Sequence, residues 1–273
     1  MTRALVLGAT GTVGRRVARQ LGERGVDVAA ASRAPADSGQ VRFGWAAPGT
    51  WEAAVDGVTH AFVMAPDGVP VDPRFLRLAA DRGVARMVLL SSKAIEAMGD
   101  QRLFAAERTV RDAGAAWTIV RADWFDQNFD EGVLRDAVLA GEVALPLGDV
   151  RQAFVDAEDL AVVAVTALTE PGHEGRTYEL GGPETLSFAE AVGIVAEAAG
   201  RPVRYLGDDG DYVRVMTGLG VDRAQALAEA GAFAALRAAG DAHVDDTVEH
   251  VTGRPPRDLR TYAREAAARG ACR

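Results

Sequence analysis

The sequence predicts an α/β fold, in which a doubly wound parallel sheet is followed by a smaller C-terminal lobe. Up to about residue 125, short apolar runs alternate with segments of helical periodicity, which is typical of βαβ units. A glycine-rich turn joins the first run to the first helical segment. The chain has 273 residues, 48% hydrophobic and 25% charged, and is therefore long enough to bury a large core.

The first part of the chain supplies most of the expected sheet. Strands are predicted over 3–7, 26–31, 41–43, 60–64, 87–90 and 117–121, with helices over 13–24, 50–55, 73–82 and 102–113. In the first helix, Val13, Val17 and Leu21 recur every four residues and form one apolar face. Right-handed crossovers between such strands place helices on both faces of a parallel sheet.

The pattern loosens after residue 121. Helices are expected over 126–139, 157–168, 188–199 and 204–244, and a strand over 177–180 is expected to return to the sheet. Ser187 and Glu190 form a capping box before a helix that should end at Gly200. We therefore predict a core of residues 1–155 and a C-terminal lobe of residues 156–273.

Composition disfavours several classes of protein. The net charge of −9 argues against nucleic-acid binding. No apolar run reaches about 18 residues, and the N-terminal run is too short for a signal peptide, so we expect a cytoplasmic protein without a membrane span. Cys272 is the single cysteine and the four histidines lack metal-ligand spacing, so we expect no disulfide within the chain and no metal site. Monomer and homodimer both stay open.

The most informative motif is a turn at residues 8–14 with the spacing Gly-x-x-Gly-x-x-Gly. Gly8 permits the tight turn, Gly11 lets the backbone approach a diphosphate, and Gly14 lets helix and strand pack closely. The helix that follows offers free N–H groups to the phosphates. The motif predicts dinucleotide binding on a Rossmann-like sheet, and its spacing resembles that of the short-chain dehydrogenase/reductase superfamily; the alternative is a turn without a ligand. The other cofactor contacts expected in this turn are Thr10, Thr12 and Val13.

The end of the second strand favours NADP(H) over NAD(H). Arg33 can pair with a 2′-phosphate and Ser32 can add a hydroxyl, whereas Asp27 stands at the other end of the strand. The alternative is that Arg33 is a solvated loop residue. Three residues that end the fourth strand are predicted beside the adenine ribose: Met64, Ala65 and Pro66.

The usual proton-transfer pair of short-chain dehydrogenases is absent. That pair is Tyr-x-x-x-Lys, and none of the four tyrosines here has a lysine four residues later. Ser91, Ser92 and Lys93, at the end of the fifth strand, are the candidate catalytic residues. Either serine could hydrogen-bond a substrate oxygen, and Ser91 is also expected to contact the nicotinamide amide. Lys93, the only lysine, could stabilise negative charge or be solvated.

The segment after the sixth strand is predicted to bind substrate. Trp124, Phe125 and Asn128 suit a flat and mostly apolar molecule, although they could instead pack the lobe against the sheet. Asp123 could serve as an acid if burial raises its pKa, or could cap the following helix.

Several segments in combination resemble the NmrA-like family of atypical short-chain dehydrogenases, of the kind found among ergot-alkaloid reductases and in actinomycete secondary metabolism. They are Met-Val-Leu-Leu-Ser-Ser at 87–92, Glu107, the stretches 112–121 and 124–129, Phe-Val-Asp-Ala-Glu-Asp at 154–159, and Tyr-Glu-Leu-Gly-Gly-Pro at 178–183. The resemblance implies NADPH-dependent reduction of quinones, imines or enoyl groups, or cofactor sensing without catalysis. Leu103 stands where family members often carry a lysine, which weakens any dehydrogenase-type proton relay.

These features predict an NADPH-dependent oxidoreductase whose substrate lobe is C-terminal. It would deliver hydride to a small aromatic or polycyclic metabolite, such as a quinone, an iminium ion or an enone. Hydride can pass directly to carbon while the protein supplies proximity and excludes water. The alternative is a non-catalytic protein that binds NADP(H) and regulates or scaffolds a partner.

Overall fold

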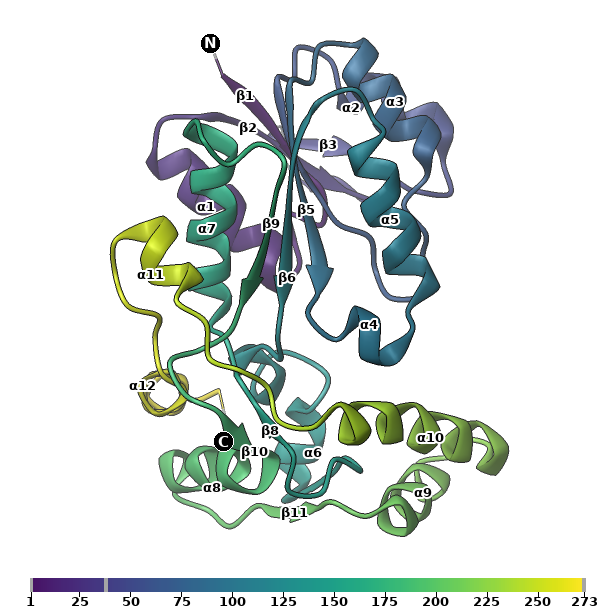
Figure 1. Cartoon of the computed structure of the whole chain (residues 1–273), viewed down its shortest axis with the longest axis vertical. Coiled ribbons are helices and arrows are strands. Elements are labelled where there is room, and N and C mark those ends of the chain that lie inside the picture. Colours follow the sequence, from purple (N-terminus) through teal and green to yellow (C-terminus); the bar gives the residue numbers. More distant parts are fainter. Residues whose placement is uncertain (1, 37–38, 272–273) are drawn as a thin grey trace.

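A seven-stranded parallel sheet forms the centre of the larger part of the molecule in the computed structural model, which describes residues 2–36 and 39–271 (Figure 1). The strand order is β3-β2-β1-β4-β5-β6-β9. The strands are β1 (Arg3–Val6), β2 (Asp27–Ser32), β3 (Gln40–Arg42), β4 (His60–Val63), β5 (Arg86–Ser92), β6 (Ala116–Ala122) and β9 (Arg176–Leu180). Every neighbouring pair is parallel, so the doubly wound, Rossmann-like α/β prediction is confirmed.

Helices cover both faces of this sheet (Figure 1). One face carries α1 (Thr12–Glu23), α7 (Ala157–Thr169) and α11 (Thr247–Thr252); the other carries α2 (Trp51–Ala54), preceded by the 3₁₀ turn η1 (Pro48–Thr50), with α3 (Pro73–Asp81) and α5 (Gln101–Arg111). The predicted apolar face of α1 is buried, since Val17 and Leu21 have no exposed surface. Helix α7 packs between α1, α11 and the sheet, which explains its run of alanine and valine.

The smaller lobe lies beyond the carboxyl ends of β5 and β6 (Figure 1). It contains η2 (Asp126–Phe129), α6 (Arg135–Ala140), β7 (Glu142–Ala144), β8 (Arg151–Gln152), β10 (Leu186–Ser187), α8 (Phe188–Ala199), β11 (Arg204–Leu206), α9 (Asp209–Gly218), α10 (Arg223–Ala239) and α12 (Leu259–Ala268). Phe129, Phe154 and Phe188 form the aromatic centre of its core, with ring centroids 5.0 to 6.4 Å apart. Phe154 and Phe188 meet edge to face, which is a favourable aromatic arrangement.

Some predicted elements are confirmed and others are wrong. The strand over 177–180 returns to the sheet as β9 beside β6, and the Ser187–Glu190 capping box is present. The single helix over 126–139 is wrong: the chain turns between η2 and α6 at Gly132, where a Cβ would lie 2.8 Å from the Asn128 Cα. The helix over 204–244 is also wrong, because residues 204–206 pair with β7 as β11 and the rest forms two separate helices, α9 and α10, which end at Ala239.

The chain passes between the two parts more than once. Phe129 and Phe154 belong to the core of the lobe, whereas α7, β9 and α11 pack with the sheet. The division at residue 155 into separate units stays a prediction.

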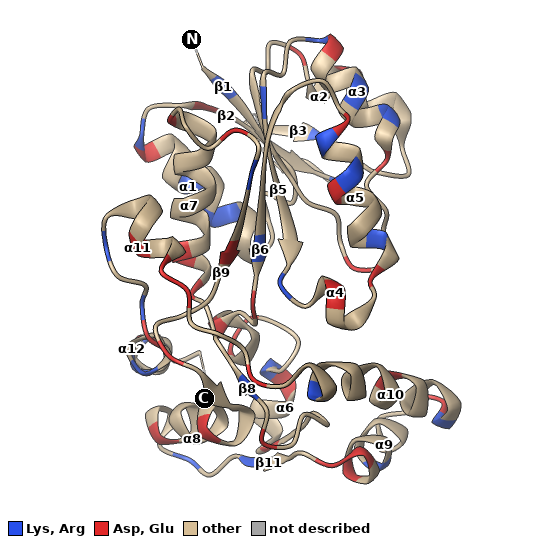
Figure 2. Cartoon of the chain, viewed as in Figure 1, with Lys and Arg blue, Asp and Glu red and all other residues tan. Residues whose placement is uncertain are grey.

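Charged residues of both signs are interspersed over the two parts of the molecule (Figure 2). No helix in the described ranges is both long and apolar enough to span a membrane. Within the same ranges, no group of three or more histidine, cysteine, aspartate or glutamate residues is placed to hold a metal ion. Cys272 lies outside the described residues.

Candidate cofactor and substrate site

The glycine turn brings the start of α1 directly against the end of β1. Gly8 has a φ of +67°, and a side chain there would also overlap the Met64 side chain. A Cβ on Gly14 would overlap the Gly8 carbonyl oxygen, which is the close packing of helix and strand that the motif predicts. Gly11 donates its N–H to the Gly8 carbonyl at 2.8 Å.

The first turn of α1 is open to a ligand. Gly11 is the N-cap residue, so no side chain caps the helix, and both Thr10 and Gly11 are exposed. Thr12 is partly buried, whereas the Val13 side chain packs in the core between α1, α7 and the sheet. Val13 therefore has only its backbone N–H to offer a cofactor. An uncapped helix N-terminus of this kind is suited to binding a diphosphate.

A free arginine follows β2. Arg33 is exposed and makes no hydrogen bond or ion pair with any residue in 2–36 or 39–271. The Ser32 hydroxyl accepts a hydrogen bond from the Ala34 N–H at 3.2 Å and can still donate. Asp27 is at the far end of the strand, 3.4 Å from the Arg3 guanidinium. At the carboxyl end of β2, the side chain available to a ribose phosphate is therefore the cation of Arg33.

A cavity of about 620 Å³ lies at the carboxyl ends of β4, β5 and β6. It brings together three predicted groups, namely Met64, Ala65 and Pro66; Ser91 and Ser92; and Asp123, Trp124, Phe125 and Asn128. The glycine turn, Ser32, Arg33 and Lys93 are outside the cavity lining, although Gly8 adjoins it through Met64. This is the edge of an open parallel sheet where ligands bind.

Ser91 has a different partner from the one expected. Its hydroxyl donates to the buried Glu107 carboxylate at 2.8 Å. Although burial opposes ionisation of Glu107, hydrogen bonds from Arg121 and Ser91 outweigh it and lower the pKa of this carboxyl. Because the Ser91 hydroxyl already donates its proton to Glu107, its oxygen can only accept a hydrogen bond from a ligand, for example from an amide N–H.

Ser92 and Lys93 differ in their freedom. The Ser92 hydroxyl accepts from the Ala94 N–H at 3.2 Å, which leaves its own proton available. Lys93 is not solvated: its side chain is 15% exposed, and its ammonium group lies 3.0 Å from the His243 carbonyl and 3.2 Å from the Asp245 carboxylate. Lys93 thus fastens the end of β5 to the segment between α10 and α11.

Asp123 is held by the backbone at the end of β6. Its carboxylate accepts hydrogen bonds from the N–H groups of Trp124 at 2.8 Å and Ala153 at 3.3 Å. Burial raises the pKa of Asp123 to about 6, and the Lys93 cation opposes this rise. Asp123 does not cap a helix, because Phe125 is the N-cap residue of η2.

The aromatic pair Trp124 and Phe125 lines the cavity and also packs the lobe against the sheet. Trp124 lines the cavity and also packs edge to face on Phe188 of the lobe, with ring centroids 5.0 Å apart. Phe125 lines the cavity and packs against the core on the face of the sheet that carries α1 and α7. The two rings therefore join the lobe to the sheet at the cavity.

Sequence reasoning missed part of the apolar wall. The short helix α4 (Ile95–Met98) follows β5, and it contributes Ile95 and Met98. Leu103 and Val133 complete this side, and Val133 is 76% exposed. A four-residue helix gives no periodic signal, so only the apolar character of Ile95 and Met98 pointed to this wall.

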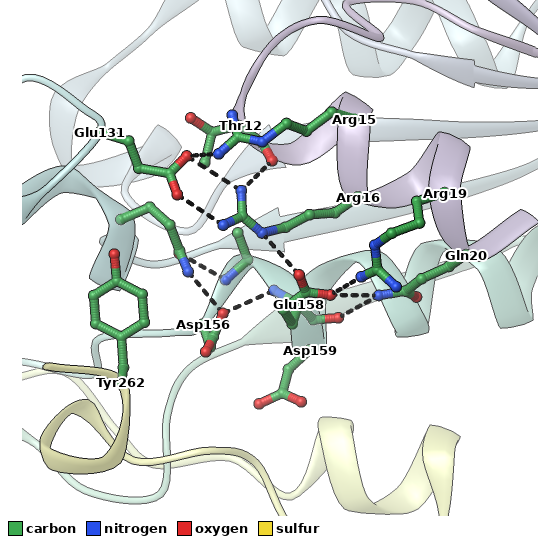
Figure 3. A network of polar contacts seen from close by, with 12 residues as sticks. Thr12, Arg15, Arg16, Arg19, Gln20, Glu131, Asp156, Glu158, Asp159 and Tyr262 are labelled. Carbon is green, nitrogen blue, oxygen red and sulfur yellow. Dashed lines mark hydrogen bonds and ion pairs between the residues drawn. The ribbon is translucent and has the colours of Figure 1, made fainter. Parts of the chain in front are cut away.

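An ionic network links the helix after the glycine turn to the segment after β6 and to α7 (Figure 3). Arg15 and Arg16 of α1 both pair with Glu131, which follows η2; the Arg16–Glu131 distance is 2.8 Å. Glu158 of α7 accepts from Arg16 at 3.2 Å and from Gln20 at 2.9 Å. The segment that follows η2, which carries Asn128, is thereby fixed to α1, which begins at the glycine turn.

The chain is similar to several reductases along its whole length. It is 36% identical to the NAD(P)H azoreductase of Xenophilus azovorans, over 97% of this chain and 98% of that protein. It is 34% identical to the (4-alkanoyl-5-oxo-2,5-dihydrofuran-3-yl)methyl phosphate reductase of Streptomyces griseus, over 96% and 97%. Festuclavine synthase I of Penicillium roqueforti is 28% identical, over 81% and 82%. No family model matches the chain.

Solved structures share the fold. The triphenylmethane reductase of Citrobacter superimposes with a TM-score of 0.80 at 21% identity, covering 98% of this chain and 100% of that one. The Escherichia coli NADPH-dependent quinone oxidoreductase, solved with NADPH, has a TM-score of 0.77 at 20% identity, over 97% and 99%.

Proposed function

Since this chain belongs to the NmrA-like family of atypical short-chain dehydrogenases/reductases, we propose that it is an NADPH-dependent reductase of small, flat, mostly apolar molecules. The observation that carries the proposal is the cavity of about 620 Å³ at the carboxyl edge of the sheet, which adjoins the open glycine turn. Cofactor and substrate can therefore meet at one edge of the sheet.

The residues of the turn fit a dinucleotide. The missing side chains of Gly8 and Gly14, together with the uncapped start of α1, leave backbone N–H groups for the diphosphate. Arg33 is free to pair with a 2′-phosphate, which favours NADPH over NADH. The fold relative solved with NADPH supports this choice, and the azoreductase relative, named for NAD(P)H, supports a nicotinamide cofactor of either kind.

The cavity lining favours an aromatic or polycyclic substrate. Trp124 and Phe125 lie on one side, and Ile95, Met98 and Leu103 add apolar surface. NADPH supplies the hydride when it is bound. None of the four tyrosines lines the cavity, so the substrate should be one whose carbon accepts hydride without a tyrosine proton donor, such as a quinone, an iminium ion or an enone. The names of the relatives, which include an azoreductase and a quinone oxidoreductase, support this range.

The test is NADPH oxidation against a panel of quinones, iminium ions and enones, with NADPH binding measured separately by calorimetry. We expect turnover with at least one acceptor class and faster turnover with NADPH than with NADH. Tight NADPH binding without turnover across the panel would instead favour the non-catalytic sensor or scaffold.

A further inference from the structure

We propose that Asp123 is the acid that protonates the reduced substrate. We further propose that Lys93 and Asp245, which form an ion pair, set how readily Asp123 gives up its proton. This inference rests on the proposed reductase function and adds the source of the proton. It replaces the Tyr-x-x-x-Lys pair, which the chain lacks.

The geometry fixes the Asp123 carboxyl group at the cavity. Both of its oxygens accept backbone hydrogen bonds, from Trp124 at 2.8 Å and from Ala153 at 3.3 Å. Its own N–H donates to the Leu180 carbonyl at 2.9 Å, which anchors this residue to β9. A carboxyl group held from two sides and lining the cavity is placed to meet a substrate atom without reorganisation.

Two opposite charges act on Asp123. Lys93, from the end of β5, stabilises its carboxylate, whereas Asp245, from the segment between α10 and α11, disfavours it. These two groups are 3.2 Å apart, and the Asp245 charge offsets part of the effect of Lys93. Burial then has the largest influence and raises the pKa of Asp123 to about 6, in the range useful for a general acid near neutral pH.

The other acidic groups and Ser91 at this cavity are less suitable, and the Ser92 hydroxyl, which keeps its proton, is a far weaker acid than a carboxyl group. Asp100 caps α5 by accepting from the Leu103 N–H at 3.0 Å, and Asp67 is fully exposed. The Ser91 proton is donated to Glu107. Asp123 is thus the partly buried carboxyl group of the lining that two backbone N–H groups hold in place.

The proton balance separates two kinds of acceptor. A quinone that receives hydride becomes a hydroquinone anion and then takes one proton; the Asp123 O–H bond breaks, an O–H bond forms on the product, and solvent reprotonates the carboxylate. An N-methylacridinium cation that receives hydride at carbon becomes a neutral acridan and needs no proton. A proton donor should therefore matter for the first acceptor and not for the second.

The test compares wild type with Asp123→Asn on both acceptors at saturating concentration. We expect kcat for the quinone to fall by about 10²-fold or more, as for the loss of a general acid, and kcat for the acridinium to change only by a small factor. The solvent deuterium isotope effect on quinone reduction should disappear in the variant. The NADPH dissociation constant, measured by calorimetry, should be unchanged.

Two further variants test the positioning pair through the pH profile of quinone reduction. Lys93→Met removes the cation that stabilises the carboxylate, so the fall in kcat with rising pH should move to higher pH. Asp245→Asn removes the opposing carboxylate and should move the fall to lower pH. Shifts in the same direction, or no shift in either variant, would contradict this role of the pair.

Three outcomes distinguish failure of the Asp123 inference from failure of the proposed reductase function. Equal slowing of both acceptors in Asp123→Asn would show a structural role and overturn the inference. A wild-type rate of quinone reduction in that variant would mean that another group donates the proton. A wild type that binds NADPH but reduces neither these acceptors nor the rest of the panel would overturn the proposed function itself.

Discussion

A side chain on Gly14 would overlap the carbonyl oxygen of Gly8, because α1 begins directly against the turn that ends β1. The contact involves backbone on both sides, so no rotamer change can relieve it. The shape of the candidate diphosphate site therefore depends on the absence of one side chain.

Gly14→Ala should distort this turn and weaken NADPH binding. Gly22→Ala, on the same helix, is the matched control, since a Cβ there meets nothing within 4 Å. The control should gain about 0.5–1 kcal/mol of stability from the better helix former. Calorimetry and thermal unfolding of both variants measure the difference, and similar NADPH affinities would contradict the role of Gly14.

Arg33→Ala should weaken NADPH binding much more than NADH binding. A charge-assisted hydrogen bond contributes about 1.5–3 kcal/mol, and only NADPH carries the 2′-phosphate. Arg33→Lys keeps the charge but loses the bidentate geometry, so its NADPH affinity should be intermediate. Competition titrations with both cofactors measure this, and an equal loss for the two would exclude a phosphate contact.

Trp124→Leu should raise KM for aromatic acceptors while leaving NADPH affinity unchanged. The substitution keeps an apolar side chain, although a smaller one, and removes the ring that lines the cavity and packs on Phe188 at 5.0 Å. An edge-to-face aromatic pair contributes about 0.5–1.5 kcal/mol, so a modest loss of stability is also expected. Steady-state kinetics with an unchanged KM would place the substrate elsewhere.

Asp126 should make the protein less stable as the pH rises. Both of its carboxylate oxygens are buried without a hydrogen-bond partner among the described residues. Burial and the neighbouring Asp156 hold the pKa of Asp126 well above its ordinary value, and Arg257 offsets this only in part. The folded state thus retains a proton that the unfolded state releases near pH 4, so stability falls through the window between the two pKa values.

Asp126→Asn should flatten this dependence of the free energy of unfolding on pH, measured by urea titration from about pH 4 upward, where an unfolded aspartate ionises. Asp136→Asn is the control, because the Asp136 side chain is 93% exposed. Parallel curves for the two variants would show that Asp126 does not contribute.

The periodic and motif-bearing parts of the fold could be predicted from the sequence. Apolar patterns predict the strands of the sheet and α1. The glycine spacing predicts the turn at Gly8 and Gly14, where a side chain would overlap neighbouring atoms. The lobe could not be predicted in the same way, since its short strands β7 and β11 are stabilised by pairing between distant segments.

The cavity likewise has residues that the sequence predicts and contacts that it does not. Its members at strand ends could be named, because parallel strands bring their carboxyl ends to one edge. The partners of Lys93 could not, because Asp245 is 152 residues further along the chain and no local pattern connects them. The burial that sets the acidity of Asp123 is likewise a property of the assembled fold.

The most direct test of the reductase assignment uses NADPH deuterated at its transferable C4 position. In single-turnover experiments with N-methylacridinium, or with the best iminium or enone acceptor of the panel, mass spectrometry of the product locates the label. We expect deuterium on the carbon of the reduced acceptor when the correct face of the nicotinamide is labelled. A product whose new carbon-bound hydrogen comes from solvent with either labelled face, or NADPH that stays unoxidised throughout, would contradict it.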